Sequence, residues 1–185
     1  MARSTKTLLA ESLKRLVNSK PLDKITVKEL VEDCGINRQT FYYNFQDIYD
    51  LLEWVFEEDA RRILEEKKNY DNWQDLFWDA FHYLQDNKVL VLNTFNSVGR
   101  SYLENRLKVR LAPVVENMLD RRTGGMNLSE QDREFVVHLY TVGMISVMFD
   151  WFANNMRDGD EEQMQKFLDK IDCSIEATVA GFATK

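Results

Sequence analysis

The sequence predicts an all-α protein of about nine helices, with an N-terminal three-helix helix-turn-helix domain followed by a larger C-terminal helical domain. Two observations support this prediction. Apolar residues recur at three- and four-residue spacing along most of the chain, as expected for helices with one buried face. Helix-capping residues precede several of these segments, and runs of β-branched residues are short.

The composition is typical of a soluble globular chain. The 185 residues are 44% hydrophobic and 30% charged, with seven Gly and two Pro, which excludes disordered, collagen-like and disulfide-scaffold classes. Cys34 and Cys173 match no metal-ligand spacing and are interpreted as reduced thiols. The first residues lack the apolar core of a signal peptide, so a cytoplasmic location is expected. No metal and no cofactor are expected.

The charge is divided unevenly along the chain. The net charge is −7, but residues 1–46 hold eight Lys and Arg against five Asp and Glu, which makes this segment +3 and the remainder −10. A small basic end joined to a larger acidic body indicates that one end meets an anion. The acidic body favours a cationic ligand or a basic partner.

Two short helices are predicted near the start of the chain. The first contains an apolar stripe and ends at Lys20-Pro21. The second begins with a capping box, in which the Thr26 hydroxyl accepts from the N–H of Glu29 and the Glu29 carboxylate accepts from the N–H of Thr26. It is expected to end near Cys34, with Gly35 in the left-handed conformation that follows such a helix.

A four-residue turn containing glycine, residues 34–37, then leads to a third helix, as in a helix-turn-helix motif. Asn37 is placed to cap this helix, expected from about Arg38 to Asn44, and Phe41 and Phe45 are expected on its inner face. The outer face holds a cation, an amide and two phenols: Arg38, Gln39, Tyr42 and Tyr43. Such side chains contact base edges and phosphates, so we interpret this face as a recognition surface rather than a solvated helix face.

The pattern of caps continues in the larger domain. Asp47 is expected to cap a fourth helix that runs to about Lys68, and residues 71–74 offer a further capping pattern for a fifth helix. Residues 89–92 have the composition of a strand or a short buried helix, and helix is favoured because no partner strand is visible. A helical stretch over about residues 100–122 contains Pro113, where a kink or break is expected.

The end of the chain predicts two long helices that pair. A loop at residues 123–127 is followed by a cap at Ser129, and residues 135–153 are apolar on nearly every side. Polar residues interrupt this stretch, so we expect no membrane span but a helix buried by its own domain and by a second chain. After a turn at residues 158–160, a last helix extends to about Phe182, and the two helices are expected to form a four-helix interface in a homodimer.

Residues 25–51, ITVKELVEDCGINRQTFYYNFQDIYDL, resemble the N-terminal domain of the TetR family of bacterial transcription regulators. The resemblance covers the capped second helix, the glycine turn, the third helix and the start of the fourth, and with the first helix it spans about 55 residues. It implies an all-helical homodimer that binds a palindromic, double-stranded DNA operator with recognition helices in successive major grooves. The C-terminal half resembles a Firmicutes-type subgroup that includes regulators of dihydroxyacetone kinase genes.

The resemblance also implies individual DNA contacts. Residues that would hold phosphates are Thr26, Thr40, Tyr43 and Asn44, and residues that would lie toward base edges are Lys28, Arg38, Gln39 and Tyr42. Asn37, at the start of the recognition helix, completes the predicted DNA-binding set. One position departs from the family: Ile48 stands where the family usually has a lysine. We therefore expect weaker operator affinity, or compensation by Arg3 and Lys6 in a flexible arm.

No constellation of enzyme residues is present. The sequence lacks a glycine-rich phosphate loop, a nucleophile elbow and an H-E-x-x-H motif, and His82 and His138 stand singly, so no enzyme is predicted. The larger domain is rich in aromatic residues, from which a ligand site is proposed at Trp78, Phe81, Tyr102, His138 and Tyr140.

The function predicted is that of a dimeric transcription regulator. Residues 1–46 would bind DNA, and residues 47–185 would dimerise and respond to an unknown small-molecule effector or protein co-regulator. The alternative is a helical protein–protein adaptor without specific DNA binding. The operator, the effector and the direction of regulation are left open by the sequence.

Overall fold

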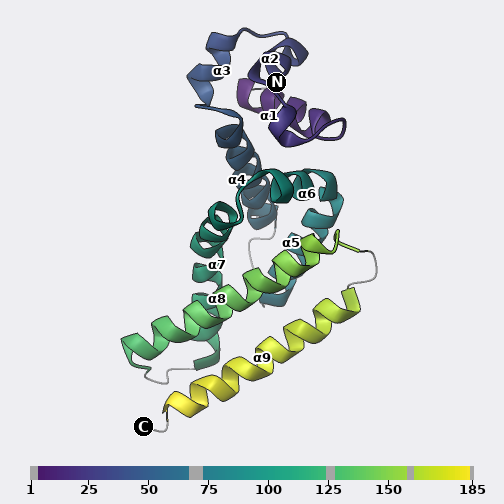
Figure 1. Ribbon diagram of the computed structural model, residues 1–185. Coiled ribbons are helices and arrows are strands. Elements are labelled where there is room, and N and C mark those ends of the chain that lie inside the picture. Colours follow the sequence, from purple (N-terminus) through teal and green to yellow (C-terminus); the bar gives the residue numbers. More distant parts are fainter. Residues whose placement is uncertain (1–3, 67–72, 124–127, 158–160, 184–185) are drawn as a thin grey trace. The chain divides into compact units, whose positions relative to one another are not determined.

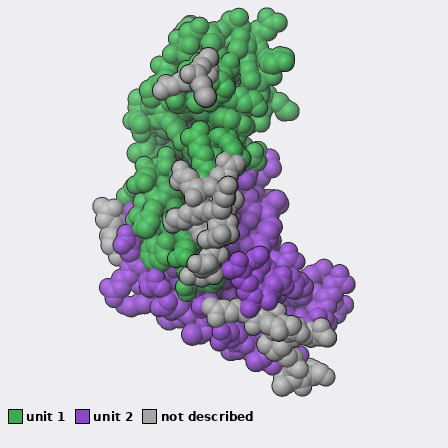
Figure 2. All heavy atoms as spheres, turned by 180° about the vertical axis from the view of Figure 1, so that it is seen from behind, with its two compact units in different colours: residues 1–97 green, residues 98–185 purple. Residues whose placement is uncertain are grey.

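The computed structural model describes residues 4–66, 73–123, 128–157 and 161–183, and these residues form nine α-helices and one short 3-10 helix without a strand. The predicted all-α class is therefore confirmed. The chain divides by packing into two compact units, residues 1–97 and residues 98–185 (Figure 2). The boundary expected at residue 46 divides the chain by role, and it stays a prediction.

The first unit begins with three short helices that share a core. They are α1 (Thr5–Leu16), α2 (Val27–Cys34) and α3 (Arg38–Asn44), with the 3-10 helix η1 (Leu22–Lys24) after α1 (Figure 1). Helix α2 packs against both α1 and α3. Leu9 and Leu13 of α1, Leu30 of α2 and Phe41 of α3 are completely buried between them. Burying side chains of this size contributes about 1.5–3 kcal/mol each, which holds short helices that would not be stable alone.

The predicted capping box and helix stop are both confirmed. The N–H of Glu29 donates to the Thr26 hydroxyl over 3.3 Å, and the N–H of Thr26 donates to the Glu29 carboxylate over 3.0 Å. At the other end of α2, Gly35 has a φ of 65°, and the N–H of Ile36 donates to the Val31 carbonyl over 2.9 Å. These bonds satisfy groups that the helix ends leave without helical partners, and they set the direction in which α3 leaves the turn.

Three further helices complete the first unit: α4 (Ile48–Glu66), α5 (Trp73–Asp86) and α6 (Lys88–Ser97). Asp47 caps α4 as predicted, because its carboxylate accepts from the N–H of Asp50 over 2.9 Å. Residues 89–92 are helical, as favoured from the sequence. The predicted end of the fourth helix at Lys68 and the capping residues Asp71 and Asn72 lie outside the described residues.

A buried polar cluster ties the helices of the first unit together. The Lys14 ammonium of α1 donates to the Asp59 carboxylate of α4 over 2.5 Å, and the Tyr83 hydroxyl of α5 donates to the same carboxylate over 2.6 Å. Burial, and then the bond to Asp59, raises the pKa of Tyr83, so its hydroxyl stays protonated as a donor. The Asn93 amide of α6 donates to the Val17 carbonyl over 2.9 Å.

The second unit consists of three long helices, α7 (Arg100–Thr123), α8 (Glu130–Ala153) and α9 (Glu161–Ala183). A break at Pro113 is not found: α7 is continuous through this residue. Val115, Met118 and Leu119, just beyond the proline, are buried, and this packing outweighs the hydrogen bond that proline removes. Ser129 caps α8 as predicted. The predicted loop at 124–127 and the turn at 158–160 lie outside the described residues.

Helices α8 and α9 lie side by side and antiparallel (Figure 1). Eight residues of α8 are buried, including Val136, Ile145 and Phe149. By length and composition α8 is the one described helix apolar enough to cross a membrane, as the buried core helix of a soluble protein also can be. Phe135 and Leu139 nevertheless remain 55% and 49% exposed.

Candidate nucleic-acid interface

Helix α3 has one buried face and one face with unusually exposed aromatic rings. Phe41 is completely buried and Phe45, which follows the helix, is 3% exposed. On the outer face, Tyr42 is 58% exposed and Tyr43 is 91% exposed. Two large rings exposed to water contribute little to the stability of the fold. Exposed aromatic rings gathered on one surface indicate a binding face.

The remaining outer side chains of α3 are free to bind. Arg38 and Gln39 are exposed, and among the described residues neither has a hydrogen-bond or ion-pair partner. A guanidinium and an amide that no other side chain engages match the donor and acceptor patterns of base edges in the major groove. The structure thus gathers Arg38, Gln39, Tyr42 and Tyr43 on one face, as the sequence indicated.

The shorter polar residues of the predicted set have partners inside the domain. The Asn37 carboxamide oxygen accepts from the N–H of Thr40 over 2.8 Å and from its hydroxyl over 3.0 Å, so Asn37 acts as the cap of α3. The Asn44 amide donates to the Thr40 carbonyl over 2.8 Å, and the Thr26 hydroxyl is engaged with Glu29. These residues fix the ends of α2 and α3, and a hydroxyl in such a bond still has a lone pair for a further donor.

Lys28 lies on α2 with most of its side chain in solvent. Within the described part of the chain its ammonium pairs with Glu32, one turn later, at 3.8 Å between nitrogen and oxygen, and both side chains are 63% exposed. An exposed pair at this distance is weak and is easily replaced by a phosphate or base. Lys28 therefore stays available as the predicted contact.

The compensation expected for Ile48 is only partly compatible with the structure. Lys6 does not lie in a flexible arm, because α1 begins at Thr5. Its ammonium lies over the rings of Phe45 and Trp54, 5.4 and 5.9 Å from their centroids. These contacts hold the cation beside the segment that joins α3 to α4. Arg3 lies outside the described residues.

Cys34, the last residue of α2, has the environment of a structural thiol. Its Sγ donates to the Leu8 carbonyl over 3.4 Å, and burial raises its pKa. A raised pKa keeps the thiol protonated, and the thiolate is the form that reacts with oxidants. The interpretation as a small turn residue is favoured over redox sensing.

The residues proposed as a ligand site are spread over both units. Trp78 and Phe81 meet edge to face in α5, with centroids 5.2 Å apart, and Phe81 is 2% exposed. In the second unit, the Tyr140 hydroxyl is bonded to Ser174 and Thr178 over 3.0 Å each, which joins α8 to α9. Tyr102 is 43% exposed. This set stays a prediction.

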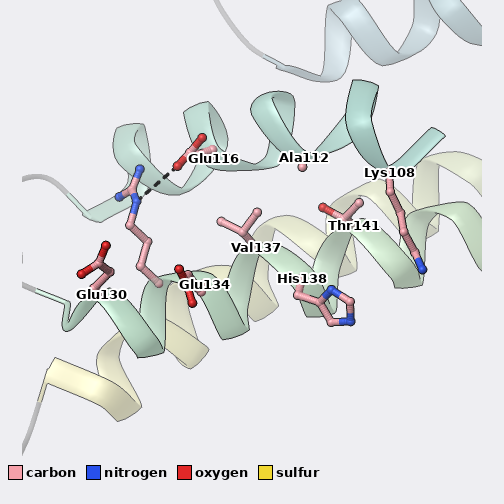
Figure 3. A pocket seen from close by; sticks show the side chains of 9 residues that line it. Lys108, Ala112, Glu116, Glu130, Glu134, Val137, His138 and Thr141 are labelled. Carbon is pink, nitrogen blue, oxygen red and sulfur yellow. Dashed lines mark ion pairs between the residues drawn. The ribbon is translucent and has the colours of Figure 1, made fainter. Parts of the chain in front are cut away.

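A groove between α7 and α8 is the feature of the second unit that the sequence interpretation missed, apart from His138 on its wall (Figure 3). It has a volume of about 380 Å³. Glu130, Glu134, His138 and Thr141, at spacings of three and four on α8, line one side of it. That spacing is the signal from which a shared helix face could have been found. In the described ranges, no group of three or more His, Cys, Asp or Glu could hold a metal ion.

Comparisons with known proteins agree with this geometry. The family described as "Bacterial regulatory proteins, tetR family" matches residues 10–55, and the family "Transcriptional regulator C-terminal region" matches residues 71–172, which is more than half of the chain. A relative from Lactococcus lactis subsp. lactis (strain IL1403), the HTH-type dhaKLM operon transcriptional activator DhaS, is 31% identical over 91 residues. That alignment spans 49% of each protein, so the chain matches about half the length of this relative.

Two solved structures share the fold. The dihydroxyacetone kinase operon activator DhaS superposes with a TM-score of 0.71, at 19% identity, over 96% of this chain and 97% of that one. A structure from Shewanella sp. PV-4 assigned to the tetR family superposes with a TM-score of 0.54, at 14% identity, over 98% of this chain and 97% of that one. The matches to both halves of the chain, together with the helix-turn-helix geometry of α2 and α3, show that this chain belongs to the TetR family of bacterial transcription regulators.

Proposed function

We propose that this DNA-binding regulator acts as a homodimer on a palindromic operator, with residues 1–46 as the DNA-binding domain and residues 47–185 as the dimerisation and signal-receiving domain. The observation that carries the proposal is the outer face of α3, where Arg38 and Gln39 have no partner among the described residues and Tyr42 and Tyr43 are exposed. A palindrome of two half-sites about 34–36 Å apart matches a two-fold symmetric protein. Cytoplasmic location follows from this role.

The homodimer is supported by the outer surface of α8. Phe135 and Leu139 are large apolar side chains, four residues apart, and both are about half exposed. Apolar residues at this spacing on a long helix form the ridge that another helix covers. A second copy of α8 and α9 would bury them in a four-helix interface.

The signal that acts on this dimer is a small molecule or a protein co-regulator. The relative DhaS is described as a transcriptional activator of the dhaKLM operon. By analogy, control of the transcription of an operon is the role proposed for this chain. A signal changes operator affinity only by the difference in its own affinity for the DNA-bound and free states. No catalytic step is assigned to the protein.

Fluorescence anisotropy with the DNA that flanks the protein's own gene tests the proposal. Wild type, Arg38→Ala/Tyr42→Ala and the control Lys166→Ala would be compared at two salt concentrations. Lys166 is an exposed cation on α9 that pairs with Glu162. Wild type and the control should bind saturably and more weakly at high salt. The operator affinity of the double variant should be about tenfold to a thousandfold lower than that of wild type, because a good base contact is worth about 1–3 kcal/mol.

The protein–protein adaptor is the second candidate, favoured by the exposed residues of α8. An adaptor with an apolar interface would show no linear fall of log affinity with log salt. A double variant that binds operator DNA as tightly as the Lys166→Ala control would contradict the role proposed for α3 and favour the adaptor.

A further inference from the structure

The groove between α7 and α8 has an uneven charge distribution. It is formed entirely within the second unit, with Lys108 and Glu116 of α7 facing Glu130, Glu134 and Thr141 of α8 (Figure 3). Its volume of about 380 Å³ is that of a small-ligand site. It is open to solvent along one side, which gives a ligand a direct path of entry.

The positive charges of the groove are already compensated. Lys108 is paired with Glu104 at 2.8 Å. The Arg133 guanidinium is paired with Asp120 at 2.6 Å and with Glu116 at 3.6 Å. Each pair neutralises a cation locally, so little positive charge remains for an anionic ligand.

Two negative charges of the groove are not compensated. Among the described residues neither Glu130 nor Glu134 has an ion-pair or hydrogen-bond partner. They stand four residues apart on α8, so their carboxylates lie on the same helix face, one turn from each other. Like charges at this spacing repel, and a cation placed between them relieves the repulsion. This end of the groove therefore attracts a positive charge.

The other end of the groove holds a buried hydroxyl group. Thr141 lines the groove and is 3% exposed, and its hydroxyl has no hydrogen-bond partner in the part of the chain that the structure describes. Buried hydroxyls in native proteins are nearly always paired, so one without a partner marks a place for a ligand group. Thr141 follows Glu134 by seven residues, which separates the two positions by about 10 Å, or two helical turns.

We propose that this groove binds a small organic cation of the amino-alcohol type, with an ammonium group between Glu130 and Glu134 and a hydroxyl or similar neutral polar group at Thr141. A neutral group suits the far end of the groove, where Lys108 is already paired with Glu104. The assignment of signal reception to this groove rests on the function proposed above. Binding of the cation itself requires no DNA, so the two proposals can fail separately.

Isothermal titration calorimetry of the full chain with 6-amino-1-hexanol tests the site. This probe carries an ammonium and a hydroxyl on a six-carbon chain long enough to approach both positions. 1-Hexanol lacks the charge, and hexylamine lacks the hydroxyl. We expect saturable binding of the amino alcohol, weaker binding of hexylamine and no saturable binding of 1-hexanol.

Three variants assign the binding to the groove. Glu134→Gln removes one free carboxylate and should weaken binding of the amino alcohol by about tenfold to a hundredfold, because bonds to charged groups are the stronger ones. Thr141→Val keeps the side-chain shape and should weaken binding about twofold to tenfold. It should not unfold the protein, since it removes a hydroxyl that is not bonded to any described residue. Glu161→Gln removes an exposed carboxylate of α9 outside the groove and should leave binding unchanged.

Two results would overturn the proposal. One is the absence of saturable binding of the amino alcohol to wild type. The other is equal binding by wild type, Glu134→Gln and Thr141→Val, which would place the probe elsewhere. Repeating the operator titration with saturating amino alcohol distinguishes ligand binding in the groove from signal reception there. An unchanged operator affinity with intact groove binding would contradict signal reception there, but not the site.

Discussion

The Asp59 carboxylate lies 2.5 Å from the Lys14 ammonium and joins α4 to α1 across 45 positions of sequence. The Asp59 side chain is 11% exposed and that of Lys14 is 34% exposed, so the two partners differ in their access to water. Without its cation, the carboxylate would be left in a poorly solvated place, where the Tyr83 hydroxyl would still donate to it. A freed Lys14 could extend into solvent. Substitutions of Lys14 and Asp59 are therefore expected to lower the free energy of unfolding by different amounts.

Lys14→Met should lower the free energy of unfolding by about 1–3 kcal/mol, which is below the cost of breaking a fully buried pair because Lys14 is one-third exposed. Asp59→Asn should cost less, since the amide can still accept from Tyr83 and the lysine can reach water. Urea unfolding followed by circular dichroism measures both. Lys24→Met, which removes a partner of the exposed Asp23 pair, should change stability by less than about 0.5 kcal/mol. Equal effects of Lys14→Met and Lys24→Met would contradict a structural role for the Asp59 contact.

The capping box of α2 predicts a defined pH dependence. Hydrogen bonds from Lys20, and then from Thr26, lower the pKa of Glu29 to about 2 from the ordinary value of 4.5. Because the pKa is lower in the folded state, the stabilisation is fully present above about pH 4.5 and is lost as the pH falls toward about 2. The difference in unfolding free energy between wild type and Glu29→Gln should therefore be larger at pH 6 than at pH 3. A difference that is the same at both values would show that the Glu29 charge does not stabilise the cap.

Gly35→Ala should destabilise the DNA-binding domain through backbone conformation alone. Gly35 has a φ of 65°, and an added Cβ would meet nothing within 4 Å. The cost is thus that of the left-handed conformation, about 1–2 kcal/mol. Gly35→Asn should cost less, because asparagine tolerates this region better than alanine. Thermal unfolding of the two variants gives the comparison, and an alanine variant as stable as wild type would contradict the strain argument.

Leu139→Glu should dissociate the proposed homodimer. Leu139 is 49% exposed on α8, so the substitution removes little packing within the chain, but in a two-fold interface it would place like charges near each other. Sedimentation velocity should show a shift from dimer to monomer at micromolar concentration. Val109→Glu, at a residue of α7 that is 74% exposed, adds the same charge elsewhere and should leave the mass unchanged. A Leu139→Glu protein that remains dimeric would place the interface on another surface.

Features encoded by neighbouring residues were predictable from the sequence. The capping box of Thr26 and Glu29, the left-handed Gly35 and the cap at Asp47 each depend on residues three to five positions apart. For the same reason the bounds of α2 and α3 agree with the expectation, and the exposed face of α3 follows from helical spacing alone.

Features that depend on distant packing were not predictable. No local pattern indicates that Lys6 lies over Phe45 and Trp54, and its expected place in a flexible arm was wrong. Pro113 was expected to kink or break a helix, and the break is absent because the buried residues beyond it hold α7 continuous. The lone hydroxyl of Thr141 is likewise visible only when α7 and α8 are placed together.

The bonds from Tyr140 to Ser174 and Thr178 have a mechanical consequence for the second unit. Apolar ridges alone allow one helix to slip along another by a turn at modest cost, since each new contact resembles the one it replaces. A slip of one turn, about 5.4 Å, would pull the Tyr140 oxygen away from both of its partners on α9. A slip of this kind would therefore lose two hydrogen bonds, about 1–3 kcal/mol in total, and the Tyr140 hydroxyl favours the observed register of α8 against α9.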